Sequence, residues 1–78
     1  MHPKEFALEW SKSNGATHCY TNPKGSMDFY RPAQGEIGWW AKCRFTLQRN
    51  ILGDGQFYYT DGHWELTERL HPDCEVLK

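Results

Sequence analysis

The 78-residue sequence has no excess of charge and no long apolar run. Nine Lys and Arg stand against ten Asp and Glu, which gives a formal net charge of −1. A balance this close creates no overall field that would draw the chain onto DNA or an anionic membrane. Spanning a bilayer takes roughly 20 consecutive apolar residues, and no stretch of the sequence approaches that length. We therefore expect no membrane partner.

Cysteine is scarce, with only Cys19, Cys43 and Cys74, and these three are widely spaced. An odd number of cysteines without close pairs does not make a disulfide framework. The first ten residues, MHPKEFALEW, also lack the apolar segment of a secretion signal. We expect a cytoplasmic protein with free thiols.

The sequence also lacks the short motifs of common catalytic sites. It has no Gly-rich phosphate loop and no nucleophile elbow. Acids such as Asp54 and Asp61 fall in expected turns, where Asp is favoured for backbone reasons. A chain this short leaves little room for a closed pocket. We predict that the protein is not an enzyme, with no catalytic residue and no cofactor.

A metal site is the next alternative, because Cys19, Cys43, His71 and Cys74 are all zinc-ligand types. Zinc sites usually take their four ligands from closely spaced pairs, and no C-x-x-C pair occurs. Cys43 falls on the expected core side of a strand, where a free cysteine acts as a small hydrophobe. We predict no metal site, and the sequence leaves a small zinc-stapled interaction module open as a second alternative.

Aromatic residues, in contrast, are plentiful at 15%, with four Trp, four Tyr and four Phe. They provide the apolar area from which a single domain, residues 1–78, can build a small core. Residues 3–14 predict a helix, with Pro3 at its first position and Phe6 and Trp10 on one face. Asn14-Gly15 is a suitable stop, since either residue can adopt the left-handed conformation.

The segment Gln56–Thr67, QFYYTDGHWELT, predicts a β-hairpin with Asp61-Gly62 in a tight turn. Side chains alternate along a strand. The predicted core face of this hairpin holds Phe57, Tyr59, Trp64 and Leu66. The predicted solvent face holds Gln56, Tyr58, Thr60, His63, Glu65 and Thr67.

Three further strands are expected at 16–21, 26–31 and 38–49, and a short edge strand at 74–77. A turn over 22–25 would place Tyr20 opposite Met27. A three-residue loop, 53–55, would keep the apolar faces of the long strand and the Gln56–Thr67 hairpin in phase. The predicted fold class is α+β, with a short N-terminal helix packed on a four- to five-stranded antiparallel β-meander sheet. The predicted core is Phe6, Trp10, Tyr20, Met27, Phe29, Trp39, Phe45, Phe57, Tyr59, Trp64 and Leu66.

The polar side of the long strand predicts a binding face. Trp40, Lys42 and Arg44 fall in one row, and Tyr58 and His63 would join it from the neighbouring hairpin. Aromatic and basic residues of this kind dominate protein interfaces, and they also stack on bases and pair with phosphates. The balanced charge favours a protein partner, which would contact either this face or the loop Pro32–Gly38. The alternative is single-stranded nucleic-acid or nucleotide binding through the same face, and a homodimer stays open.

The segments NGATHCY and FYYTDGHWEL and the pair Trp39-Trp40 give the chain a texture that resembles small accessory proteins of tailed bacteriophages. The resemblance extends over the whole chain and assigns no individual residue. It implies a viral protein in the host cytoplasm that binds and inhibits a host enzyme or defence complex, or that sequesters a nucleotide signal.

Overall fold

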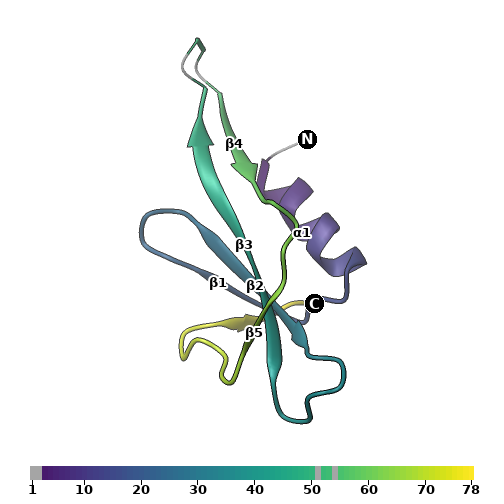
Figure 1. Ribbon diagram of the computed structural model, residues 1–78. Coiled ribbons are helices and arrows are strands. Elements are labelled where there is room, and N and C mark those ends of the chain that lie inside the picture. Colours follow the sequence, from purple (N-terminus) through teal and green to yellow (C-terminus); the bar gives the residue numbers. More distant parts are fainter. Residues whose placement is uncertain (1–2, 51, 54) are drawn as a thin grey trace.

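The computed structural model describes residues 3–50, 52–53 and 55–78. Within these ranges, all strand pairs are antiparallel, in the order β4-β3-β2-β1-β6 with β5 also paired to β3 (Figure 1). The elements are α1 (Pro3–Ser13), β1 (His18–Thr21), β2 (Met27–Pro32), β3 (Trp40–Arg49), β4 (Gln56–Tyr59), β5 (Glu65–Thr67) and β6 (Glu75–Val76). This confirms the α+β class and the helix on an antiparallel sheet, with a strand count slightly above the predicted four to five.

Helix α1 ends where the sequence predicts, at a left-handed glycine. The N–H of Ala16 donates to the carbonyl of Ser11 at 2.9 Å, and the N–H of Gly15 donates to the carbonyl of Lys12 at 3.0 Å. These two bonds form a Schellman motif, which needs a residue with positive φ just past the helix. Gly15 supplies it with a φ of 90°. Arg31 Nη1 also donates to the Asn14 carbonyl at 2.9 Å.

We expect Gly15→Ala to lower the free energy of unfolding by about 1–2 kcal/mol, because an L side chain is strained at this φ. A Cβ at position 15 would meet only Arg31 Cδ, at an ordinary 3.9 Å, so the backbone alone carries the cost. The control is Gly53→Ala, where φ lies outside the left-handed region and the nearest atom to an added Cβ, Asn50 Nδ2, is at an ordinary 3.7 Å. Urea unfolding measures both variants, and equal losses would contradict the role of the cap.

The core lies between α1 and the face of the sheet toward it, which we call the first face. The Phe45 ring is fully buried and meets Trp10 and Phe29 edge-on, each with ring centroids 5.5 Å apart. Trp64 packs on the same cluster and stacks against Trp10. The buried members are Ala7, Met27, Phe29, Cys43 and Phe45. The predicted core residues Phe6, Phe57, Tyr59 and Leu66 are instead exposed, and Tyr20 and Trp39 are partly buried outside this cluster.

The predicted hairpin over Gln56–Thr67 is wrong. Strand β4 pairs with residues 46–49 of β3, and β5 pairs with residues 40–42 of the same strand. The chain therefore runs on along β3 as one interrupted strand. Five residues, 60–64, separate Tyr59 from Glu65. Only three residues, 43–45, separate their partners on β3, Thr46 and Lys42. The Asp-Gly pair makes this bulge, with Gly62 at φ 75° and the His63 N–H donating to Asp61 Oδ1 at 2.9 Å.

The register between β3 and β4 also differs from the prediction. Leu47 pairs with Tyr58, so Tyr58 points to the core and its two neighbours point away from it. The in-phase loop at 53–55 is excluded by these pairs, although Asp54 itself lies outside the described residues. A one-residue change of register exchanges the two faces of a strand, which explains why Phe57 and Tyr59 leave the predicted core.

The first hairpin is likewise shifted by one residue. Cys19 pairs with Phe29 and Tyr20 with Asp28, so the predicted pairing of Tyr20 with Met27 is wrong. The loop closes with the Asn22 N–H donating to the Ser26 carbonyl at 2.8 Å, and Gly25 adopts a φ of 100° inside it. A bulge glycine therefore lengthens the loop by one residue beyond the predicted four-residue turn.

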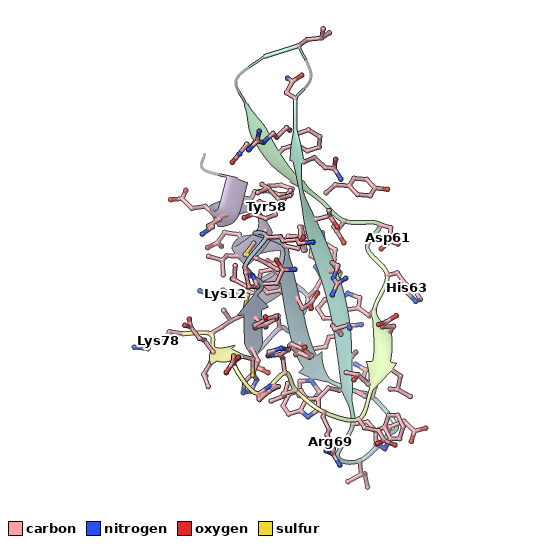
Figure 2. The ribbon with its side chains drawn as sticks, turned by 90° about the vertical axis from the view of Figure 1, so that its left-hand side faces the viewer. Lys12, Tyr58, Asp61, His63, Arg69 and Lys78 are labelled. Atoms are coloured by element: carbon pink, nitrogen blue, oxygen red, sulfur yellow. The ribbon has the colours of Figure 1, made fainter. Side chains whose placement is uncertain are left out.

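The sheet face opposite α1, which we call the second face, is covered only in part. The chain leaves β5 at one edge and returns as β6 beside β1 at the other, so residues 68–74 cross this face (Figure 2). The His71 ring stacks on Tyr20 with centroids 3.5 Å apart, and the His71 backbone hydrogen-bonds the Tyr30 hydroxyl. Tyr30 is consequently only 3% exposed. The β3–β4 part of the second face stays open.

Candidate functional site

The predicted row of Trp40, Lys42 and Arg44 lies on the second face of β3. These side chains alternate with Cys43 and Phe45, which are buried on the first face. Trp40 is itself partly buried, because its ring packs edge-on against His18 with centroids 5.1 Å apart. The open part of the row therefore begins at Lys42.

Tyr58 does not join this row, and that part of the prediction is wrong. It packs against the core on the first face, on the side of α1, whereas Asp61 and His63 lie on the other side of β3 (Figure 2). The reason is the register, which pairs Tyr58 with the inward-facing Leu47.

Phe57 and Tyr59 take the place of Tyr58. They pair with Gln48 and Thr46 on the second face, and they are 48% and 58% exposed. The β3–β4 hairpin that carries them projects from the body of an elongated molecule measuring 45 × 23 × 23 Å (Figure 1). The sequence did not reveal either residue, because the predicted register kept the apolar faces of the long strand and the Gln56–Thr67 hairpin in phase. A two-residue loop, Asp54-Gly55, exchanges the two faces of the second strand and predicts Phe57 and Tyr59 on the open face.

Arg44 is held in one orientation by Asp28, a buried carboxylate on β2. The Arg44 Nε donates to Asp28 Oδ1 at 2.8 Å, and Nη2 donates to Oδ2 at 3.1 Å. These hydrogen bonds, together with the Asp28 charge, raise the pKa of Arg44 above its usual value. The Arg44 side chain stays 56% exposed while that of Asp28 is 8% exposed. The surface thus presents a guanidinium that is fixed and already paired.

Two adjoining cavities open beside Arg44, where the bulge interrupts the pairing with β3. Each has a volume of about 190 Å³, and they share Arg44 and Asp61. We call them together the Asp61 groove. Its lining residues are Lys42, Arg44, Thr46, Tyr59, Thr60, Asp61, His63 and Glu65. The groove brings together three of the five predicted site residues, Lys42, Arg44 and His63.

No family model, curated protein or solved structure matches this chain. No helix in the described part of the chain is long and apolar enough to cross a membrane.

The zinc-ligand residues do not converge among the described residues. In residues 3–50, 52–53 and 55–78, no three His, Cys, Asp or Glu side chains are placed to hold one metal ion. Cys43 is fully buried, with its Sγ 3.3 Å from Thr60 Oγ1. Burial raises the pKa of the Cys43 thiol, and it raises the pKa of Cys19 from 9.0 to about 11. Both thiols are held neutral inside the fold.

This burial predicts a loss of stability at alkaline pH. Between pH 9 and pH 11 the Cys19 thiol ionises in the unfolded chain but not in the folded one. The unfolded state then binds fewer protons, so the free energy of unfolding falls as pH rises through this window. Burial also raises the pKa of Tyr30, which acts in the same direction. Urea midpoints measured from pH 8 to 11 should fall, and less steeply in Cys19→Ala. Parallel curves would contradict the assignment to Cys19.

Proposed function

We propose that this chain is a small, non-enzymatic protein-binding module that contacts its partner through the open β3–β4 part of the second face. The observation that carries the proposal is the pair Phe57 and Tyr59, about half exposed on a projecting hairpin. Tyr59 lines the same cavity as Arg44. Tyr and Arg are the residue types enriched at the energetic centres of protein interfaces.

The fixed guanidinium supports the same proposal. An arginine that must be ordered on binding loses side-chain entropy, which costs on the order of 1 kcal/mol for a long flexible side chain. Asp28 has already ordered Arg44 by two hydrogen bonds in the free protein. A partner that contacts Arg44 therefore meets a preorganised group.

Charge pairing favours a protein over a nucleic acid. Phosphate binding depends on cations that release counterions from the nucleic-acid backbone. Arg44 is paired with Asp28, and Lys42 Nζ lies 3.3 Å from Glu65 Oε1. Stacking of a base on Tyr59 keeps single-stranded nucleic acid as the second candidate, although the two cations beside Tyr59 on this face, Lys42 and Arg44, are already paired with carboxylates.

The narrower expectation, an inhibitor of a host enzyme or defence complex in the host cytoplasm, follows from the resemblance to phage accessory proteins. It defines the sample for the test, which is a bacterial lysate treated with nuclease. Tagged wild-type protein should retain one stoichiometric partner in a pull-down analysed by mass spectrometry. Phe57→Ala/Tyr59→Ala should lose it.

The matched control is Ile37→Ala, since Ile37 is fully exposed and lies outside the β3–β4 hairpin. This variant should retain the partner. A partner that survives the double substitution contradicts the proposed surface. If the only retained material is nucleic acid from untreated lysate, with affinity that falls steeply with salt, the second candidate replaces the first.

A further inference from the structure

We infer that the Asp61 groove receives a basic side chain of the protein partner, a Lys or an Arg, which forms an ion pair with Asp61. The inference rests on the proposed function and specifies the chemistry of the partner at that surface.

The ion pairs within the groove single out Asp61. Of the charged groups that line it, Lys42 pairs with Glu65 and Arg44 pairs with Asp28. Asp61 is the remaining charge, and it has no ion pair within the described part of the chain. The groove therefore carries one uncompensated negative charge. A positively charged group is its complement, because complementary potentials across an interface steer association and fix register.

Local geometry holds the Asp61 carboxylate in place. Its Oδ1 accepts the N–H of His63 at 2.9 Å, and Gly62 makes the bulge with a φ of 75°. The second carboxylate oxygen, Oδ2, has no hydrogen bond from the described residues and can accept one from a ligand. Tyr59 lines the same cavity as Asp61. An aromatic ring beside a carboxylate suits a basic side chain, whose cation is attracted to both and whose methylene stem can pack on the ring.

The size of the groove fits a side chain rather than a lone ion. A cavity needs a volume of roughly 10–15 Å³ to hold one water molecule. Each of the two cavities measures about 190 Å³. The groove is also continuous with Tyr59, so a segment lying across the exposed aromatics could place one residue into it.

An anionic group fits less well. To pair with Arg44 it would have to compete with Asp28, whose side chain is 8% exposed and accepts two hydrogen bonds from the guanidinium. Removing one partner from such a pair leaves a buried charge uncompensated, which is costly. To pair with Lys42 it would have to displace Glu65, and Asp61 would repel it in either place.

The test uses three capped tripeptides, Gly-Arg-Gly, Gly-Gln-Gly and Gly-Glu-Gly, titrated into the ¹⁵N-labelled chain and followed by NMR. The Arg peptide should shift the amide resonances of Thr60, Gly62 and His63, and the Glu peptide should not. Asp61→Asn keeps an oxygen for the His63 N–H and removes the charge. It should weaken binding of the Arg peptide by about 1.5- to fivefold, the range of a single exposed ion pair. Asp73→Asn, a change of the same kind at an exposed acid outside the groove, should leave the affinity unchanged.

Equal shifts from the Arg and Glu peptides overturn the inference, as does an Asp61→Asn variant that binds the Arg peptide with wild-type affinity. The pull-down separates this failure from that of the proposed function. A partner lost in Phe57→Ala/Tyr59→Ala but kept in Asp61→Asn rejects the ion pair and keeps the binding surface. A partner kept in both variants rejects the surface, and the peptide titration still decides the groove.

Discussion

Phe45→Ala should lower the free energy of unfolding by about 3–5 kcal/mol, the range observed when a buried Phe is truncated to Ala. The Phe45 side chain is 0% exposed, and its ring meets both Trp10 of α1 and Phe29 of β2. It therefore joins the helix to the sheet at the centre of the core. A 78-residue domain has a small core and a thin margin of stability, so this loss should leave much of the chain unfolded at 25 °C.

Urea unfolding followed by circular dichroism measures the loss. The matched control is Phe57→Ala, the same substitution at a side chain that is 48% exposed on the second face, where we expect about 1 kcal/mol or less. Phe45→Leu keeps most of the side chain and gives a measurable midpoint if Phe45→Ala does not fold. A larger loss in Phe57→Ala than in the Phe45 variants would mean that the faces of β3 and β4 are assigned the wrong way round.

Signals confined to one element predicted that element well. Helix α1 begins at Pro3 and is followed by Asn14-Gly15, and both ends were readable because caps and stops act within a few residues. The alternation along β3 placed Cys43 and Phe45 inward and Arg44 outward, since the period of two is a property of any strand.

Signals that depend on two elements predicted the pairing of strands less well. Asp61-Gly62 correctly marks a local turn with positive φ at Gly62, but it does not say which strand the chain joins afterwards. Strand β3 is ten residues long, which is enough to accept β4 and β5 one after the other on a single edge. Where the chain goes after the Asp-Gly turn therefore depends on the length of β3, a property of another segment of the chain.

The same distinction explains the outcome for the site. Lys42 and Arg44 belong to one strand and were found together. Choosing between Tyr58 and its neighbours Phe57 and Tyr59 needed the register across two strands. The predicted register kept the apolar faces of the two segments in phase, whereas the structure packs Tyr58 against the core instead. Aromatic residues on an exposed face depart from the pattern that maximises stability, and such departures are where function is expected.

The ion pair behind the proposed surface gives the second large effect. Asp28→Ala should lower the free energy of unfolding by about 1.5–3 kcal/mol, the range for hydrogen bonds to a charged group, because it removes both bonds to Arg44. The loss should stay below that of a fully buried pair, since the Arg44 side chain is 56% exposed and can be solvated by water. Urea unfolding at neutral pH measures it.

Glu65→Ala is the control for Asp28→Ala, because it breaks the Lys42–Glu65 pair, which lies on the same face but is more exposed. We expect a loss of less than about 1 kcal/mol there. The amount of partner retained in the pull-down is the second measurement. If Arg44 binds while fixed by Asp28, Asp28→Ala should weaken capture even where the chain is still folded, and Arg44→Ala should weaken it at least as much. Equal stability losses in the two carboxylate variants would remove the special role of Asp28. A stability loss without weaker capture would keep Asp28 as a structural residue and contradict the contribution of Arg44 preorganisation to binding.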